Sequence, residues 1–365
     1  MKSKIVTVLL VSAILLSACA GKKFSAEPYK EMRFATLPAS SVVFLSDRGM
    51  LAASYLDGTI RSLDINTGKA VLKMPAGNPV EALSYTGNNG ILISADRAGF
   101  VKLWEIKTGQ LIKSIKLSDT AAFSCAANPD GTLFAAASGG KAAIYVTKNT
   151  IKIKELNTAA NMPYRQVNFS GDKKRFLAAA GDTINIFNIS KSTGLKKFFI
   201  PESIDIKNEL SIKNNHAINS AVFSGDSSLI AAAGDGGVLN VYRAEDGYKV
   251  WSDPSFSGAL RALAFSPGSK YLAAGDNSGR LVFYSSKTGE KLAELQVPSG
   301  IYGTAFSPSG KLFAASTSTG VVKIWETPKD AKKIVIDFSG LKTVLLSLLA
   351  AAVILAVIFI RLRRK

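Results

Sequence analysis

Residues 305–326, AFSPSGKLFAASTSTGVVKIWE, contain the pattern that predicts the fold of this chain. An apolar pair leads into a Ser-Pro-Ser-Gly turn at residues 307–310, and the apolar residues 312–315 predict a buried strand. A Thr-Gly turn at residues 319–320 precedes a run from Val321 to Trp325 that predicts another strand. Short strands separated by tight turns indicate an all-β structure.

The same pattern recurs at a regular interval along the chain. Each unit closes its third strand with an aromatic or large apolar residue: Leu63, Trp104, Tyr145, Phe187, Tyr242, Tyr284 and Trp325. The intervals are 41, 41, 42, 55, 42 and 41 residues. The residue that opens the first turn of each unit keeps the same phase: Ser46, Thr86, Asn128, Ser170, Ser224, Ser266 and Ser307. A period in the low forties predicts a β-propeller with seven blades of four strands.

A propeller closes when one terminus completes the sheet begun by the other, which removes the free sheet edges. Residues 32–37 and 334–338 are the candidates for this closing strand, so the propeller is expected to span residues 30–338. Both ends of the chain should then leave from the same blade.

The repeats resemble those of the WD-repeat family over roughly residues 30–335, through their phase, their Phe-Ser-Pro turns and the Trp-Glu pairs at Trp104 and Trp325. Family membership would imply a propeller whose loops contact partner proteins. The family also carries an aspartate six residues before the closing aromatic, which occurs here only at Asp57, and a Gly-His pair, whereas this chain has one histidine, His216. The chain therefore resembles a divergent member, and a quinoprotein-like propeller with a further blade is the alternative.

The first residues predict export and lipidation. Residues 1–18 combine a basic start, an apolar stretch and small residues before Cys19, as in a bacterial lipoprotein signal peptide, with residues 19–29 as a tether. Cys19 would carry the lipid. Ordinary cleavage at the Ala18-Cys19-Ala20 site is the alternative.

The last residues predict a membrane anchor. Residues 343–360 carry no charge over 18 positions, enough for a transmembrane helix, and residues 361–365 form a basic tail. Because basic segments stay in the cytoplasm, the propeller would lie on the extracytoplasmic, periplasmic side of the bacterial cytoplasmic (inner) membrane. Ala20 would instead favour the outer membrane by the usual sorting rule, which the helix should override. A sorting tail that is cut off after export is the alternative for the helix itself.

The net charge of +18 narrows the classes of partner. Residues 141–213 contain 13 basic and 6 acidic residues, so blades three and four contribute much of the charge. Outside the cytoplasm an acidic protein face, anionic lipid or an anionic wall polymer is a better partner than nucleic acid. With Cys19 lipidated, Cys125 is left without a disulfide partner and is interpreted as a small buried hydrophobe.

Catalytic and metal-binding patterns are weak. One histidine cannot build a metal cluster or supply the several roles of a hydrolytic site, and His216 is interpreted as a loop residue. Aspartates recur between second and third strands at Asp96, Asp182, Asp235 and Asp276, but their offsets from the closing aromatic differ, which favours turn capping over a cation-binding ring. We therefore predict a non-enzymatic protein without catalytic residues, metal or cofactor.

The irregular interval of 55 residues predicts an insertion of about 11 residues within residues 202–215, after the fourth strand of blade four. In the resembled family that type of loop lies on the face most used for partners. Seven residues are the candidates for partner binding: Tyr164, Arg165, Lys207, Lys213, Asn219, Arg261 and Tyr302. The predicted function is an extracytoplasmic, membrane-anchored scaffold for protein–protein interaction in the bacterial cell envelope. A module that binds anionic wall polymer or glycan through blades three and four is the alternative.

Overall fold

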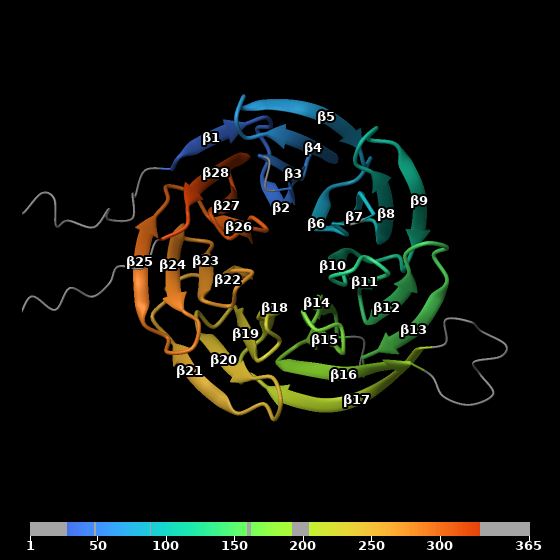
Figure 1. Cartoon of the computed structure of the whole chain (residues 1–365), viewed down its shortest axis with the longest axis vertical. Coiled ribbons are helices and arrows are strands. Elements are labelled where there is room, and N and C mark those ends of the chain that lie inside the picture. The colour runs from blue at the N-terminus through green and yellow to red at the C-terminus, as the bar shows by residue number, and fades with distance from the viewer. Residues whose placement is uncertain (1–27, 47–48, 88, 159–161, 192–203, 329–365) are drawn as a thin grey trace, which may run out of the picture. The chain divides into compact units, whose positions relative to one another are not determined.

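The computed structural model describes residues 28–46, 49–87, 89–158, 162–191 and 204–328. These residues form seven antiparallel sheets of four strands, arranged as the blades of a propeller around a central channel (Figure 1). The prediction of an all-β, seven-bladed propeller is confirmed, and the described residues contain no eighth sheet.

The strands of blades one to six run outward from the channel in chain order, and in blade seven the outermost strand comes from the N-terminal end. The first, innermost strands are β2 (Ala39–Ser46), β6 (Val80–Tyr85), β10 (Ala122–Ala127), β14 (Tyr164–Phe169), β18 (Ile218–Phe223), β22 (Leu260–Phe265) and β26 (Ile301–Phe306). The second strands are β3 (Met50–Tyr55), β7 (Ile91–Asp96), β11 (Leu133–Ser138), β15 (Arg175–Ala180), β19 (Leu229–Gly234), β23 (Tyr271–Asp276) and β27 (Leu312–Thr317).

The third and fourth strands complete the blades. The third strands are β4 (Thr59–Asp64), β8 (Phe100–Glu105), β12 (Lys141–Val146), β16 (Thr183–Lys191), β20 (Leu239–Arg243), β24 (Arg280–Ser285) and β28 (Val321–Glu326). The fourth strands are β5 (Lys69–Pro75), β9 (Leu111–Lys116), β13 (Lys152–Asn157), β17 (Ile204–Lys213), β21 (Lys249–Asp253), β25 (Lys291–Gln296) and, in blade seven, β1 (Lys30–Arg33).

The N-terminal strand closes the ring. Strand β1 pairs antiparallel with β28, with Met32 opposite Val322, and so supplies the outer strand of the last blade. Met32 is 3% exposed and packs in a core cluster that also contains Phe44 of blade one and Ile324 of blade seven. Of the two candidate segments for the closing strand, residues 32–37 overlap the observed strand only at Met32 and Arg33, because β1 runs from Lys30 to Arg33; residues 334–338 lie outside the described residues.

The core lies between neighbouring blades. Each second strand carries alanines that are fully buried, such as Ala135, Ala178 and Ala231. Ala178 packs in one cluster with Phe169, Phe176 and residues of blade three. Small side chains let adjacent sheets approach closely near the axis, while aromatic residues fill the wider space farther out.

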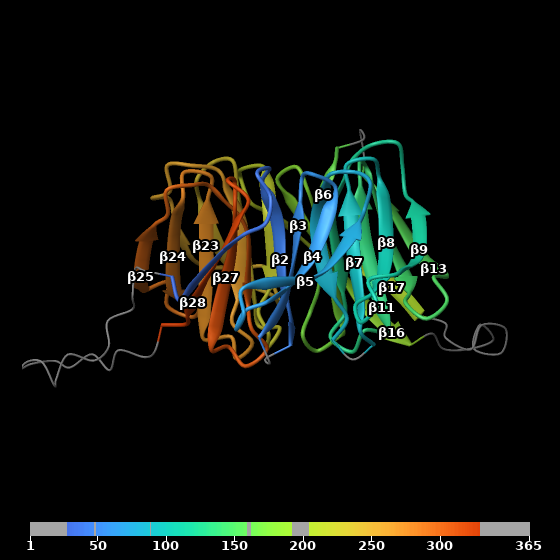
Figure 2. The same ribbon diagram turned by 90° about the horizontal axis from the view of Figure 1, so that it is seen from above.

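The propeller has two faces, because consecutive strands in a blade are antiparallel (Figure 2). We call the side with the connections from fourth to next first strand, and from second to third strand, the loop face. The opposite side, with the first-to-second and third-to-fourth hairpins, is the turn face. The first residue of β1 belongs to the turn face, since Lys30 Nζ donates a hydrogen bond to the Asn66 carbonyl in a third-to-fourth hairpin (3.0 Å). Strand β28 also ends on the turn face.

The second periodic marker of the sequence has a local cause on the turn face. In six first-to-second turns the side-chain oxygen of the marker residue accepts a hydrogen bond from the backbone N–H five residues later, at 2.9–3.1 Å. The six acceptors are Thr86, Asn128, Ser170, Ser224, Ser266 and Ser307. A short polar side chain is needed there because the turn leaves that N–H without a strand partner.

The predicted position of the insertion is wrong. Blade four has long third and fourth strands, β16 with 9 residues and β17 with 10, so part of the extra chain lengthens these two strands. Residues 204–213 of the proposed loop are the fourth strand itself, with Ile206 and Ile212 buried. The reason is that β16 continues past Phe187 to Lys191, whereas each of the other six third strands ends one residue after its closing residue. The lengthened ends of these strands, where Lys191 pairs with Ile204, lie on the turn face and not on the loop face.

No helix in the described part of the chain is both long and apolar enough to cross a membrane. The predicted signal peptide, Cys19, the transmembrane segment 343–360 and the basic tail lie outside the described residues.

Candidate functional site at the mouth of the central channel

Every first strand contains a β-bulge at its second residue. In all seven blades the pairing between first and second strands skips this residue. The skipped residues are Ser40, Glu81, Phe123, Arg165, Asn219, Arg261 and Tyr302, which we call the bulge ring. A bulge leaves one residue out of the ladder and redirects its side chain, which explains why chemically different residues occupy equivalent backbone positions.

The residue before each bulge anchors the strand. These first residues are Ala39, Val80, Ala122, Tyr164, Ile218, Leu260 and Ile301, and each is at most 3% exposed. They are apolar or aromatic because they pack between blades. Six of the seven bulge residues next to them are partly or fully exposed at the loop face, and the seventh, Ser40, is 7% exposed. The first residue of each inner strand therefore serves packing, and the bulge residue that follows it lies at the cavity, where a ligand could contact it.

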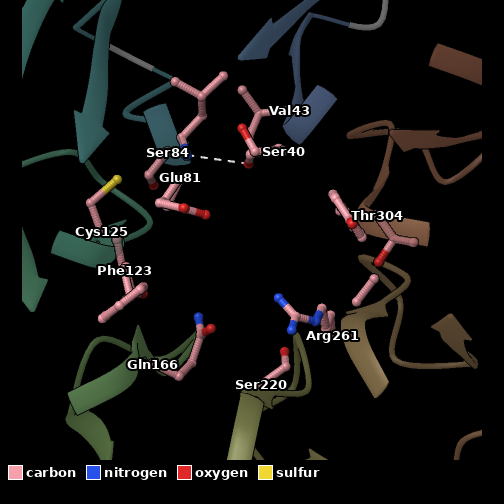
Figure 3. A pocket seen from close by; sticks show the side chains of 18 of the residues that line it. Ser40, Val43, Glu81, Ser84, Phe123, Cys125, Gln166, Ser220, Arg261 and Thr304 are labelled. Atoms are coloured by element: carbon pink, nitrogen blue, oxygen red, sulfur yellow. Dashed lines mark hydrogen bonds between the residues drawn. The ribbon is translucent and has the colours of Figure 1, made fainter. Parts of the chain in front are cut away.

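The bulge ring surrounds a cavity of about 410 Å³ in the central channel. All seven bulge residues line it, together with polar residues farther along the first strands such as Gln166, Asn168 and Ser220. Figure 3 shows Glu81, Gln166 and Arg261 extending from different blades toward the open centre. The inner strands thus hold polar side chains from every blade around one recess.

The charged groups of the mouth differ in their partners. Glu81 forms an ion pair with Arg97 of the same blade. The guanidinium carbon of Arg165 lies 4.1 Å from the ring centre of Phe123, and that of Arg261 lies 5.9 Å from the ring centre of Tyr302. Stacking on a ring occupies one flat side of a guanidinium and leaves its N–H edge available for hydrogen bonds.

Asn219 lies between these two arginines in the order of the blades. Its amide donates hydrogen bonds to Asp235 Oδ1 (2.7 Å) and to the Leu260 carbonyl (3.4 Å). It therefore ties blade five to blade six and holds the Asp235 carboxylate at the loop face. The mouth contains acceptors as well as donors, so any ligand must match an ordered arrangement of charge.

Channel residues also connect neighbouring blades directly. Ser41 Oγ accepts a hydrogen bond from Leu83 N–H (3.2 Å), and Ser124 Oγ accepts one from Val167 N–H (3.1 Å). Asn168 Oδ1 accepts one from Phe223 N–H (3.0 Å). Hydrogen bonds between first strands of successive blades fix the spacing of the bulge ring, so its side chains are presented on a rigid support.

The structure brings together four of the seven predicted partner-binding residues: Arg165, Asn219, Arg261 and Tyr302 all belong to the bulge ring. Tyr164 is 3% exposed in the core between blades three and four, so its side chain is not available at the loop face. Lys207 and Lys213 lie away from the channel on β17, and Lys213 pairs with Asp182 (2.7 Å). Cys19 lies outside the described residues.

Sequence reasoning missed Ser40, Phe123, Gln166 and Arg97 as residues of this site. Phe123 occupies the same repeat position as Arg165 and Arg261, which the repeat alignment could have identified. The bulge itself has no pattern of its own in the sequence, because the extra residue only becomes evident when the partner strand is known.

The turn aspartates act mainly within their own turns. Asp96 Oδ1 accepts hydrogen bonds from the N–H groups of Ala98 and Phe100, both at 3.0 Å. Asp276 Oδ1 accepts the corresponding bonds from Ser278 and Arg280, both at 2.9 Å. For these two residues the interpretation as turn caps is confirmed.

Cys125 and His216 occupy different environments. Cys125 is 6% exposed, its Sγ lies 3.5 Å from the Ile93 carbonyl oxygen, and burial raises the pKa of its thiol. A thiol that resists ionisation is a weak nucleophile, in line with its interpretation as a small buried side chain. His216 is an exposed loop residue beside Gly236.

Other polar contacts occupy the places where the resembled family has its histidine–aspartate network. In blade two Trp104 Nε1 donates a hydrogen bond to Ser94 Oγ (2.9 Å), and Lys102 pairs with Asp96 (2.9 Å). In blade five Asn214 Oδ1 accepts hydrogen bonds from Asn240 and Tyr242. These two blades therefore tie their third strands to neighbouring segments through different polar contacts.

Asp253 makes the corresponding contact for blade six. Asp253 is 8% exposed. Its carboxylate accepts a hydrogen bond from Tyr284 Oη (2.6 Å) and forms an ion pair with Lys291 Nζ (2.9 Å). Burial opposes ionisation of Asp253, but hydrogen bonds from Ser255, Tyr284 and Lys291 outweigh it and hold the pKa well below its usual range. Burial and the adjacent carboxylate raise the pKa of Tyr284.

The Asp253→Asn variant should lose about 2 kcal/mol of unfolding free energy at pH 7, the scale of hydrogen bonds to a charged group. Because the folded pKa is depressed, the stabilisation from the carboxylate is complete above the usual aspartate value of about 4 and is lost as pH falls below it. Urea unfolding at several pH values should therefore show wild type and variant converging below about pH 4. A constant difference down to pH 2 would contradict this account. Asp119→Asn, at an exposed loop residue, is the control.

The basic residues of blades three and four are partly neutralised. Ion pairs join Lys152 to Glu155 (2.5 Å), Lys173 to Asp130 (3.2 Å) and Arg175 to Glu209 (3.1 Å). Together with Lys213 and Asp182, they reduce the charge that this side offers to a polymer.

Comparisons with known proteins identify the same repeats. The model of the Anaphase-promoting complex subunit 4 WD40 domain matches residues 221–302, and that of the WD domain, G-beta repeat matches residues 289–326. These matches cover most of blades five to seven.

Curated relatives match over parts of their length. WD repeat and SOCS box-containing protein 1 of Xenopus tropicalis is 28% identical over 121 residues, which are 32% of this chain and 29% of that protein. Pre-mRNA-processing factor 19 homolog 2 of Arabidopsis thaliana is 29% identical over 129 residues, 34% of this chain and 24% of that protein. Periodic tryptophan protein 2 of Arabidopsis thaliana is 22% identical over 215 residues, 58% of this chain and 22% of that protein. The chain therefore matches less than a third of the length of each of these relatives.

Proposed function

Because this chain is a WD-repeat β-propeller, we propose that it is a non-catalytic platform that binds partner proteins through its loop face. The bulge ring carries this proposal. Seven equivalent backbone positions present seven side chains, of five chemical kinds from serine to arginine, around one recess. Such variation on a rigid and repeated support is suited to recognising a particular partner surface.

The place of the chain ends in the fold supports the same face. Strand β1 begins and β28 ends on the turn face, so any segment attached to either end departs from the side opposite the bulge ring. The ends of the described fold therefore lie on the face opposite the proposed binding surface. The matched family model is itself named for a subunit of a complex.

The proposal includes a location. A lipid on Cys19 and a membrane helix at residues 343–360 would hold the propeller on the extracytoplasmic side of a bacterial cytoplasmic membrane. Two attachments to one membrane would keep the platform at the envelope, with partners drawn from envelope proteins. Metabolic labelling with a fatty-acid analogue, compared between wild type and Cys19→Ser, tests the lipid. Membrane fractionation of native cells tests the location, and recovery in the outer membrane would contradict it.

Crosslinking in native cells tests the platform. Wild type and a loop-face variant with Asn219→Ala and Tyr302→Ala should be compared by crosslinking, detergent extraction and mass spectrometry. We expect a discrete envelope protein with wild type and at least a tenfold lower yield with the variant, since aromatic anchors at an interface contribute 2 kcal/mol or more, roughly 30-fold in affinity.

A matched control changes similar residues elsewhere. Tyr248→Ala and Asn149→Ala alter exposed residues of third-to-fourth hairpins on the turn face and should leave the yield unchanged. Equal loss in both variants would contradict recognition by the loop face. Deleting residues 202–215 is not a suitable test, because the deletion removes strand β17.

Binding of an anionic wall polymer or glycan is the second candidate function. Exposed lysines without a described ion pair support it, among them Lys141, Lys154 and Lys207. Binding led by these charges should weaken steeply as salt rises, whereas a hot-spot protein interface should change little.

A further inference from the structure

The bulge ring contains two arginines that lie over aromatic rings, and they distinguish this channel mouth from a generic polar recess. Among the described residues, neither Arg165 nor Arg261 forms an ion pair with a carboxylate, and both are exposed. Arg97, the third arginine of the mouth, is instead paired with Glu81. Two guanidinium groups are thus held in place without being neutralised.

Each of these arginines is held by the adjacent blade. The guanidinium of Arg165 of blade four lies over the ring of Phe123 of blade three, and that of Arg261 of blade six lies farther out over the ring of Tyr302 of blade seven. Contact with a ring restricts the rotamers of the arginine before a ligand binds, so less side-chain entropy is lost on binding. The planar N–H edge stays available to donate two hydrogen bonds to one carboxylate. Between them lies blade five, whose Asn219 is committed to Asp235 and Leu260.

We propose that Arg165 and Arg261 bind an acidic segment of the partner polypeptide, with one carboxylate on each arginine and the chain between them crossing the channel mouth. This inference rests on the proposed platform function and names the chemistry of its partner.

The shape of the site favours a polypeptide segment as the occupant. The recess of about 410 Å³ is concave and lined by serine, asparagine and glutamine side chains that can hydrogen-bond to a backbone. A flat membrane surface does not enter such a recess, whereas an extended chain can. Glu81 and Asp235 repel a segment that places its carboxylates at the wrong blades, so the two acceptors contribute register as well as selectivity.

Titration of the full-length protein in detergent tests this proposal. The probe is a short synthetic peptide of alternating glutamate and serine, and the comparison is the same peptide with glutamine in place of glutamate. Wild type should bind the glutamate peptide and discriminate against the glutamine peptide by at least tenfold. The double variant Arg165→Gln and Arg261→Gln should bind the glutamate peptide about a hundredfold more weakly, about tenfold for each charge-assisted contact.

Two further variants sharpen the test. Arg175→Gln with Arg243→Gln removes the same charge from ion-paired arginines at the turn face and should change the affinity by no more than about twofold. Glu81→Gln removes a competing carboxylate and frees Arg97, so the affinity for the glutamate peptide should rise severalfold. Both variants change exposed or half-buried side chains, and their unfolding curves should match that of wild type.

Several results would overturn the proposal. If the variant Arg165→Gln with Arg261→Gln and the variant Arg175→Gln with Arg243→Gln lose equal affinity, net charge alone attracts the peptide. Equal binding of the glutamine peptide would remove the carboxylate requirement, and binding of phosphatidylglycerol vesicles that depends on Arg165 and Arg261 would identify a lipid ligand instead. Capture of an envelope protein that is lost with Asn219→Ala and Tyr302→Ala but retained by the arginine double variant would keep the platform function and reject the acidic segment.

Discussion

The Met32→Asp variant should lose at least 4 kcal/mol of unfolding free energy and with it the closed ring, because truncating a buried methionine costs about 2–5 kcal/mol and burying an unpaired charge adds to that. Met32 is the residue of β1 that enters the core between blades seven and one. Strand β1 has four residues, whose side chains are in order half-buried, exposed, buried and exposed. Met32 is therefore its one buried side chain. Losing this contact should release β1 and expose the edge of β28.

The consequences of opening the ring should extend beyond blade seven. An unpaired β28 presents free N–H and C=O groups, and the core between blades seven and one loses the Met32 side chain while Val322 and Ile324 remain. We expect a less cooperative urea transition and early proteolytic cleavage at the ends of the described fold, measured on the full-length protein in detergent.

Two control substitutions isolate the closure. Arg33→Asp introduces the same residue on the exposed side of the same strand and should change the stability by about 0.5 kcal/mol or less. Met32→Leu conserves volume and should cost less than about 1.5 kcal/mol. A Met32→Asp protein that unfolds like wild type would show that β1 does not contribute to the closed state.

The Gly279→Ala variant should be the most damaging of three glycine replacements, with a loss of about 3 kcal/mol or more from backbone strain and overlap together. Gly279 lies in the second-to-third turn of blade six with a φ of +90°. An added Cβ would lie 2.0 Å from the Val297 carbonyl oxygen and 2.8 Å from that of Ser299, because the connection to blade seven passes over this turn. The Gly279 carbonyl oxygen also accepts a hydrogen bond from the Val297 N–H (2.8 Å).

Two other glycines separate the causes. Gly77 has a φ of +85° but nothing within 4 Å of an added Cβ, so Gly77→Ala should cost only the strain of about 1–2 kcal/mol. Gly268 also has open space and no positive φ, so Gly268→Ala should lie within about 0.5 kcal/mol of wild type. Thermal and urea unfolding of the three proteins give the order. Equal losses of stability at Gly279 and Gly77 would show that the segment from Val297 to Ser299 shifts enough to accommodate a methyl group at Gly279.

Much of the fold was predictable because each blade repeats the same local requirements. A side-chain oxygen such as that of Ser224 or Ser307 must cap the first turn, and the third strand must end in a large residue that fills the space between blades, such as Trp325. These requirements act within a few residues of one another, so they leave a regular pattern in the sequence.

The candidate site was predictable in part for the same reason. Arg165, Asn219, Arg261 and Tyr302 were recognised because they open the first strands in the repeat alignment. Tyr164 is a tyrosine like Tyr302, but it lies one residue before the bulge position, and at that position the side chain is buried between blades. The insertion was assigned to the wrong face because strand lengths vary with pairing to a distant segment, here β16 with β17, which the local pattern does not reveal.

The sequence by itself determined the number of blades, their phase and the all-β architecture, since turns, caps and buried strands are local and recur. Only the tertiary structure decided which terminus closes the ring, which residues form the bulge ring and which of the described arginines lack an ion-pair partner within the described part of the chain. These features depend on strand register and on contacts between residues far apart in the chain. Their energies come from pairing across blades, so they leave no periodic mark on the residues that make them.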